Sequence, residues 1–173
     1  MLDPEIERLR RLRGAALKLR VLAKELAARG GAPDEPLLHR GACSAWRLAR
    51  VVSGRLRAHP FADFQKDAGV GLLVGNAIAA KFTAQVASTR IQALKAFDQQ
   101  LKGLCRRLDD ARALAWDADL SDTLGRSQAE LRALASATQA SLSDHHGTAV
   151  PFAGLARIHD GERAVADWPF VAL

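Results

Sequence analysis

Apolar residues recur every three or four positions along most of the chain, which is the period of one face of an α-helix. The first such line is preceded by Asp3, Pro4 and Glu5, a capping acid, a first-turn proline and a dipole-compatible acid. Gly30 and Gly31 predict the end of this helix. Its apolar line consists of Leu9, Leu12, Ala16, Leu19, Ala23 and Leu26. Leu17 and Val21 lie off this line, which indicates that a second face of the helix is also covered.

A second helix is predicted from Leu37 to Ala58, after a short loop at 30–36 and before Pro60. Its apolar line consists of Leu38, Ala42, Ala45, Ala49, Val52 and Leu56. Gly41 and Gly54 fall inside this helix, where glycine weakens helical structure. Continuity of the second helix is therefore an open question at these two positions.

After a turn or bend at 61–67, a long helical stretch is predicted from Val70 to Trp116, about 70 Å at 1.5 Å per residue. Its apolar line consists of Ala87, Ile91, Leu94, Leu101, Leu108 and Ala115, flanked by Phe97, Leu104 and Cys105. The pattern also allows a break near Gly103 or around 83–85.

A last helix is predicted from Asp122 to Leu142, with Ser121 as a candidate cap. Its line consists of Leu124, Ser127, Leu131, Leu134, Thr138 and Leu142. Beyond it the pattern changes, because Asp160-Gly161 lies between alternating apolar positions, which is typical of a hairpin. Trp168-Pro169-Phe170 supplies large apolar groups that would dock this tail.

These elements predict an all-α fold: an antiparallel bundle of four to five helices, one of them long, with a short C-terminal extended or hairpin tail. The bundle occupies residues 1–142 and the docked tail residues 143–173. The chain has 173 residues, of which 49% are hydrophobic and 25% charged, so a core can form without disulfides or metals.

The charge is unevenly distributed. The net charge is +6, but residues 1–57 carry +7 and residues 109–173 carry −5. A basic segment of this kind favours contact with nucleic acid, an anionic membrane or an acidic partner. The acidic part could instead neutralise the basic part. The arginine excess is equally typical of a GC-rich bacterial gene.

Basic residues form strips on the first two predicted helices, away from their apolar lines. The strips consist of Arg40, Arg47, Arg50 and Arg57 on the second helix, and Arg13, Arg20 and Lys24 on the first. Adjacent strips would form a positive groove suited to a phosphate backbone, and Trp46 beside them could stack on a base. The alternative is an ordinary solvated helix face, with Trp46 as core filling.

Gly71 and Gly75 form a pattern of small residues that lets helices approach closely. Packing within the chain is the favoured interpretation, and an interface between copies is the alternative. The run lacks the GK[ST] of a phosphate loop and the preceding strand of a dinucleotide site.

No pattern of catalytic or metal-binding residues is found. The histidines lack HExxH spacing, no serine lies in GxSxG, and Cys43 and Cys105 are far apart. Each cysteine is interpreted as a small buried residue. We expect no cofactor, no metal and no enzymatic activity.

The apolar stretch 68–80 is too short for the roughly 20 residues of a membrane span, and no secretory signal is found, so we expect a cytoplasmic protein. The favoured hypothesis is a non-enzymatic helical accessory subunit that contacts the nucleic-acid phosphate backbone, independently of sequence, within a larger assembly. The alternative is a protein–protein adaptor or chaperone-like bundle whose partners are proteins, copies of itself included.

Overall fold

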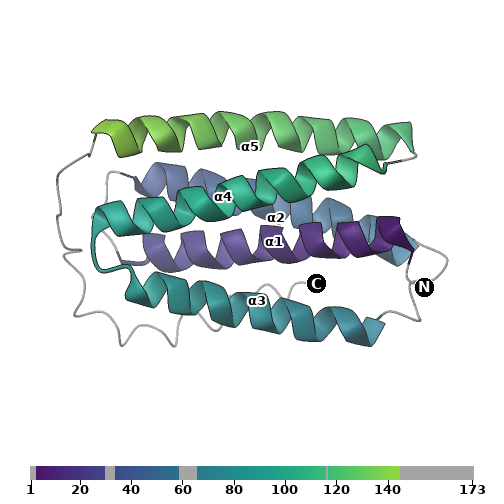
Figure 1. Ribbon diagram of the computed structural model, residues 1–173, viewed down its shortest axis with the longest axis horizontal. Helices are drawn as coiled ribbons and strands as arrows, with labels where there is room; N and C mark the ends of the chain where they lie inside the picture. The colour runs from purple at the N-terminus through teal and green to yellow at the C-terminus, as the bar shows by residue number, and fades with distance from the viewer. Residues whose placement is uncertain (1–2, 30–33, 59–65, 116, 145–173) are drawn as a thin grey trace.

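The computed structural model describes residues 3–29, 34–58, 66–115 and 117–144. These residues form five α-helices and no β-strand, which confirms the all-α class (Figure 1). The helices are α1 (Pro4–Ala27), α2 (Glu35–Ala58), α3 (Lys66–Val86), α4 (Arg90–Ala113) and α5 (Ala118–Asp144).

Helix α1 is the centre of the bundle. It packs against α2, α3 and α4, whereas α5 lies on the far side of α2 and α4 from α3 (Figure 1). The predicted apolar line of α1 is buried, and so are Leu17 and Val21, at 2% and 4% exposure. The expectation of a second covered face is therefore confirmed, because α1 has neighbours on three sides.

The start of α1 follows the capping logic of its sequence. The Asp3 side chain accepts a hydrogen bond from the Glu5 backbone N–H at 2.9 Å, and Pro4 is the first helical residue. An acid at this position satisfies an otherwise unpaired N–H and suits the positive end of the helix dipole.

Helix α2 is continuous through both of its glycines. Close packing explains why position 41 is a glycine, since a Cβ built there would lie 2.5 Å from the Cζ carbon of Phe97. Phe97 is fully buried. The apolar line predicted for α2, from Leu38 to Leu56, is buried throughout.

The prediction of one long helix from Val70 to Trp116 is wrong. Helical structure is interrupted at residues 87–89, so α3 and α4 are separate helices of ordinary length. Thr89 causes the break by capping α4: its side chain accepts from the Gln92 backbone N–H, and the Gln92 side chain accepts from the Thr89 backbone N–H. This reciprocal pair is a capping box. Of the two places where the pattern allowed a break, the observed one lies just after residues 83–85. Gly103, the other place, lies inside α4.

Helix α5 begins four residues earlier than predicted, at Ala118. Asp117 caps it by accepting from the Asp119 backbone N–H at 2.9 Å, so Ser121 lies inside the helix. Leu124, Leu131, Leu134 and Thr138 are buried as expected, whereas Leu142 and Ser127 are only partly covered. The helix reaches Asp144, two residues beyond the predicted end of the bundle.

Three further predictions lie outside the described residues. They are the turn at 61–67 up to residue 65, the hairpin at Asp160-Gly161 and the docking of Trp168-Pro169-Phe170; the last two residues of the predicted turn instead begin α3.

Candidate nucleic-acid interface

The two predicted basic strips lie on directly packed helices, α1 and α2. On α2 all four arginines of the strip are exposed: Arg40, Arg47, Arg50 and Arg57. On α1 Lys24 is exposed, whereas Arg13 and Arg20 are partly buried. The charged groups of the two strips therefore differ in their exposure to solvent.

Arg10, Arg13 and Arg57 bring positive charges from both helices close together. Burial lowers the pKa of the Arg13 guanidinium, and the positive charges of Arg10 and then Arg57 lower this pKa further. The Arg13 Nε atom is buried and has no hydrogen-bond partner among the described residues. Arginine remains protonated at neutral pH, so like charges are concentrated at this point of the α1–α2 surface.

Arg20 and Trp46 form the second contact between the strips. The Arg20 guanidinium carbon lies 3.8 Å from the centroid of the Trp46 ring, a cation–π arrangement. Trp46 is half-buried and packs against the hydrophobic core. One face of the indole is therefore covered by Arg20, and stacking on a base would have to use what remains exposed.

Arg47 differs from the other arginines of its strip because it meets an acid of the C-terminal third. It forms an ion pair with Glu130 of α5, and the Ser44 hydroxyl donates to the same carboxylate at 2.6 Å. The acidic C-terminal third of the chain therefore neutralises the charge of Arg47.

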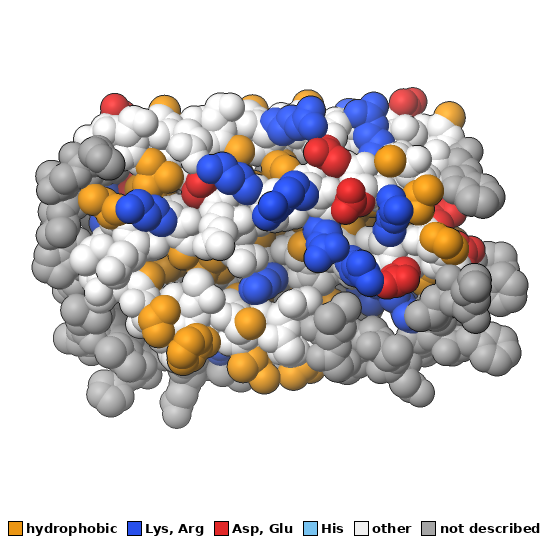
Figure 2. Space-filling view, in the orientation of Figure 1, with side chains coloured by type: hydrophobic (Ala, Val, Ile, Leu, Met, Phe, Trp, Pro, Cys, Tyr) orange, Lys and Arg blue, Asp and Glu red, His pale blue; other side chains and the backbone are white. Residues whose placement is uncertain are grey.

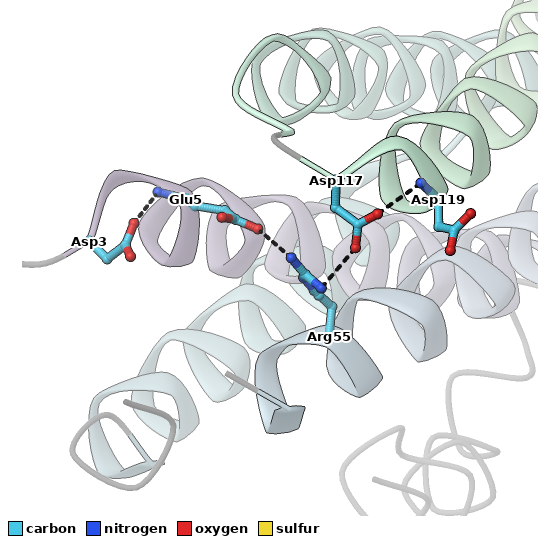
Figure 3. Close-up of polar contacts among 5 residues, drawn as sticks. All are labelled: Asp3, Glu5, Arg55, Asp117 and Asp119. Atoms are coloured by element: carbon cyan, nitrogen blue, oxygen red, sulfur yellow. Dashed lines mark hydrogen bonds and ion pairs between the residues drawn. The ribbon is translucent and has the colours of Figure 1, made fainter. Parts of the chain in front are cut away.

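Arg55, which the predicted strip does not include, serves a structural role. It lies between acids from two other segments, 3.5 Å from Glu5 of α1 and 3.2 Å from Asp117 before α5 (Figure 3). Asp117 in turn caps α5 through Asp119. Arg55 therefore ties three helices together at one end of the bundle.

A basic cavity between α1 and α4 was not predicted. It has a volume of about 170 Å³ and is lined by Arg8, Arg11, Arg107 and Asp110. Arg8 donates to the Asp110 backbone oxygen at 2.9 Å, and Arg11 pairs with Glu7. Figure 2 shows basic side chains with acidic ones among them on this face. The sequence signal for this cavity was the pair Arg8 and Arg11, which lie three positions apart on one helix. Arg107 lines the same cavity but is distant in sequence, so periodicity could not connect it to them.

Gly71 and Gly75 both lie on α3. Gly75 is exposed, and a Cβ built there would meet no atom within 4 Å. Among the described residues, none packs closely on Gly75. The small residues that face α1 and the core are alanines instead: Ala77, Ala80 and Ala84.

The interpretation of Cys43 as a buried residue is wrong, because its side chain is exposed on the outer side of α2. Cys105 is partly covered, and burial raises the pKa of its thiol; the Asp109 charge adds to this rise and Arg132 opposes it. Within the described ranges, no cluster of His, Cys, Asp and Glu is suited to hold a metal ion. His39 is exposed near Glu35, and the other histidines lie outside these ranges.

The comparisons with known proteins found no relative. No protein-family model matches the chain. No curated protein and no solved structure matches it either. Among the described helices, none combines the length and apolar character needed to cross a membrane.

Proposed function

We propose that this chain is a non-enzymatic helical accessory subunit that contacts the phosphate backbone of nucleic acid within a larger assembly. The observation that carries this proposal is the row of exposed arginines on α2, Arg40, Arg50 and Arg57, on a helix that packs directly against the basic strip of α1. Exposed positive charges grouped on one surface favour an anion that offsets them. A phosphate group does this through charge-assisted hydrogen bonds with guanidinium groups.

The contact would extend along the same pair of helices. Arg50 is exposed on α2 like Arg57, and Arg20 of α1 lies over the ring of Trp46. Arg40 and Lys24 continue the two strips toward the other end, whereas Arg47 contributes less because Glu130 neutralises it. Such a surface holds phosphates and does not read bases, so binding is independent of sequence.

The test is fluorescence anisotropy of the full chain with labelled single-stranded DNA, duplex DNA and RNA, from low to physiological salt. We expect binding that weakens by about 0.9 decades per decade of salt for each phosphate neutralised on duplex DNA. Absence of binding to all three probes at low salt would overturn the proposal.

A matched pair of variants locates the contact. Arg57→Gln removes an exposed charge from the α1–α2 junction, and Arg126→Gln removes an exposed charge from α5. We expect Arg57→Gln to weaken binding to all sequences alike and to reduce the salt slope by about one phosphate. Arg126→Gln should leave both nearly unchanged. Equal losses in the two variants would show that only net charge matters.

A second function, that of a protein–protein adaptor, is favoured by an exposed apolar face on α3. In either role we propose that the helices alternate in direction as an antiparallel bundle. We also propose that the tail predicted over residues 143–173, whose first two residues belong to α5, docks on this bundle. Copurification with a partner protein after nuclease treatment would support the adaptor role over the nucleic-acid role.

A further inference from the structure

The cavity between α1 and α4 holds basic groups that the proposed nucleic-acid contact does not use. Its volume is about 170 Å³, and its lining consists of Arg8, Arg11, Arg107 and Asp110. The first two residues come from α1 and the last two from α4, which packs directly against α1 (Figure 1). The lining thus contains three guanidinium groups and one carboxylate, so two positive charges are in excess.

This cavity lies on a different side of α1 from the basic strips. At 100° per residue, the midpoint between Arg8 and Arg11 lies about 160° around the helix from the midpoint between Arg10 and Arg13. Arg13 is the α1 residue whose pKa responds to the charge of Arg57 on α2. A ligand in the cavity and a nucleic acid on the strips would therefore occupy separate surfaces.

Two charged groups of the cavity are without a partner among the described residues. Within those ranges, no hydrogen bond or ion pair engages the Arg107 guanidinium or the Asp110 carboxylate. Arg8 is held at the cavity by a hydrogen bond to the Asp110 backbone oxygen at 2.9 Å, and its guanidinium has further donors. Arg11 instead pairs with Glu7. Arg8 and Arg107 are therefore the groups that remain for an anion.

We propose that the cavity binds a small phosphate ester that also carries a hydroxyl group. A phosphate monoester has nearly two negative charges at neutral pH, which matches the excess of positive charge in the lining. Guanidinium groups bind phosphate through paired, charge-assisted hydrogen bonds, so Arg8 and Arg107 would hold it from two helices. An ionised carboxylate only accepts hydrogen bonds, so Asp110 would repel a second phosphate and accept from a hydroxyl.

The size of the cavity limits the ligand. Pockets for drug-sized molecules measure about 300–1,000 Å³, so a cavity of about 170 Å³ admits a phosphate group with a few further atoms. Larger esters would extend beyond it. Because so few atoms are in contact, we expect dissociation constants in the millimolar range.

NMR titration of the isotope-labelled full chain with glycerol phosphate, followed through its arginine Nε–H signals, tests this proposal. Ethyl phosphate is the matched ligand without hydroxyl groups, and glycerol is the matched ligand without phosphate. We expect saturable shifts of the Arg8 and Arg107 signals with glycerol phosphate, weaker binding of ethyl phosphate and no binding of glycerol. Absence of saturable shifts at these two arginines would overturn the proposal, and so would equal affinities for the two esters.

A matched pair of arginine variants locates the phosphate group. Arg107→Gln should weaken binding of glycerol phosphate by about tenfold or more, because it removes a hydrogen bond between charged groups. Arg106→Gln removes an exposed guanidinium from the adjacent position, which does not line the cavity, and should leave the affinity nearly unchanged. Equal losses in the two variants would mean that the ester responds only to net charge, against the proposal. Circular dichroism verifies that each variant is helical.

The role of Asp110 is tested by the preference between the two esters. Asp110→Ala should strengthen binding of ethyl phosphate, because a like charge is removed from the lining. The same variant should lose the preference for glycerol phosphate, because the acceptor for its hydroxyl is absent. A preference that persists in Asp110→Ala would contradict this role.

A competition experiment separates the cavity from the nucleic-acid contact. Saturating glycerol phosphate should displace no more labelled duplex DNA from the chain than sodium chloride of equal ionic strength does. Greater displacement would show that one surface binds both ligands, which overturns a separate site. If the chain binds no nucleic acid, the proposed function fails, and the ester titrations still decide the present proposal.

Discussion

At the scale of single residues, Gly41 of α2 lies directly against the ring of Phe97 of α4. The Phe97 ring occupies the space that a side chain at position 41 would need. A glycine in a helix costs about 1 kcal/mol relative to alanine, so its presence here reflects the packing and not the helix.

Gly41→Ala should therefore destabilise the protein. The new Cβ would lie 2.5 Å from a fully buried ring, and overpacking of a core costs about 1–3 kcal/mol. The helix gains about 1 kcal/mol from alanine, so we expect a net loss of up to about 2 kcal/mol in the free energy of unfolding by urea. Gly54→Ala is the control: open space surrounds Gly54, and the same change should stabilise. A stabilised Gly41→Ala variant would contradict the contact.

The two cysteines should react at different rates. Cys43 is exposed, whereas burial and Asp109 raise the pKa of the Cys105 thiol, which lowers its thiolate fraction near pH 8. Mass spectrometry after brief treatment with iodoacetamide should show modification of Cys43 first. Because the raised pKa favours the protonated thiol in the fold, Cys105 contributes stability below its unfolded pKa, and this contribution is lost as the pH rises through the folded pKa. Equal rates at the two thiols would argue against the burial of Cys105.

At the scale of elements, the separation of α3 from α4 depends on local hydrogen bonds. The Ser88 hydroxyl and backbone both donate to the Gln92 side chain, at 3.0 Å each, and Thr89 completes the capping box. These bonds offer the backbone an alternative to a continuous helix.

Thr89→Ala should remove the Thr89 half of this box. The Gln92 N–H then loses its acceptor at the start of α4, and loss of an N-cap costs about 1 kcal/mol. The control is Thr83→Ala, because the Thr83 hydroxyl donates to the Ala79 carbonyl inside α3 and caps nothing. Urea unfolding should show a clear loss for Thr89→Ala and little or none for Thr83→Ala. A similar loss in both variants would mean that the cap is not what stabilises α4.

The sequence predicted elements best where one periodic apolar line runs unbroken along one helix. The lines from Leu38 to Leu56 and from Leu9 to Leu26 are buried as expected. The α3–α4 break was missed because apolar spacing continues across it: Ala87 and Leu94 are both buried, so periodicity alone cannot show the turn between them. The capping pattern Thr89 to Gln92 was the signal that could have shown it.

At the scale of the whole molecule, ion pairs between distant segments decide which arginines face an open surface. The exposure of the α2 strip followed from helix geometry, but the pairing of Arg47 with Glu130 depends on α5 packing beside α2. The meeting of Arg13 with Arg57 depends likewise on how α1 and α2 pack. The periodicity of a single helix carries no information on either of these two contacts. The basic strips could therefore be predicted from the sequence, whereas the contacts of their arginines with other helices could not.

Asp34 joins three segments at one end of the bundle. It is 3% exposed, and its carboxylate accepts from Arg90 at 2.6 Å and from Ser141 at 2.7 Å. Asp34→Ala would leave the Arg90 guanidinium, itself largely covered, without this carboxylate, and breaking a buried pair costs about 3–5 kcal/mol. We expect a lower melting temperature in calorimetry. Glu35→Ala, at an exposed neighbouring carboxylate, is the control and should change it little.

The central place of α1 has a consequence for biosynthesis. The ribosome makes α1 before the three helices that bury its sides, so its apolar faces stay exposed until residues near Ala113 have emerged. A nascent chain paused before α4 would present these faces to chaperones and to other nascent chains. The segment with the most buried sides is thus also the one that waits longest for its neighbours.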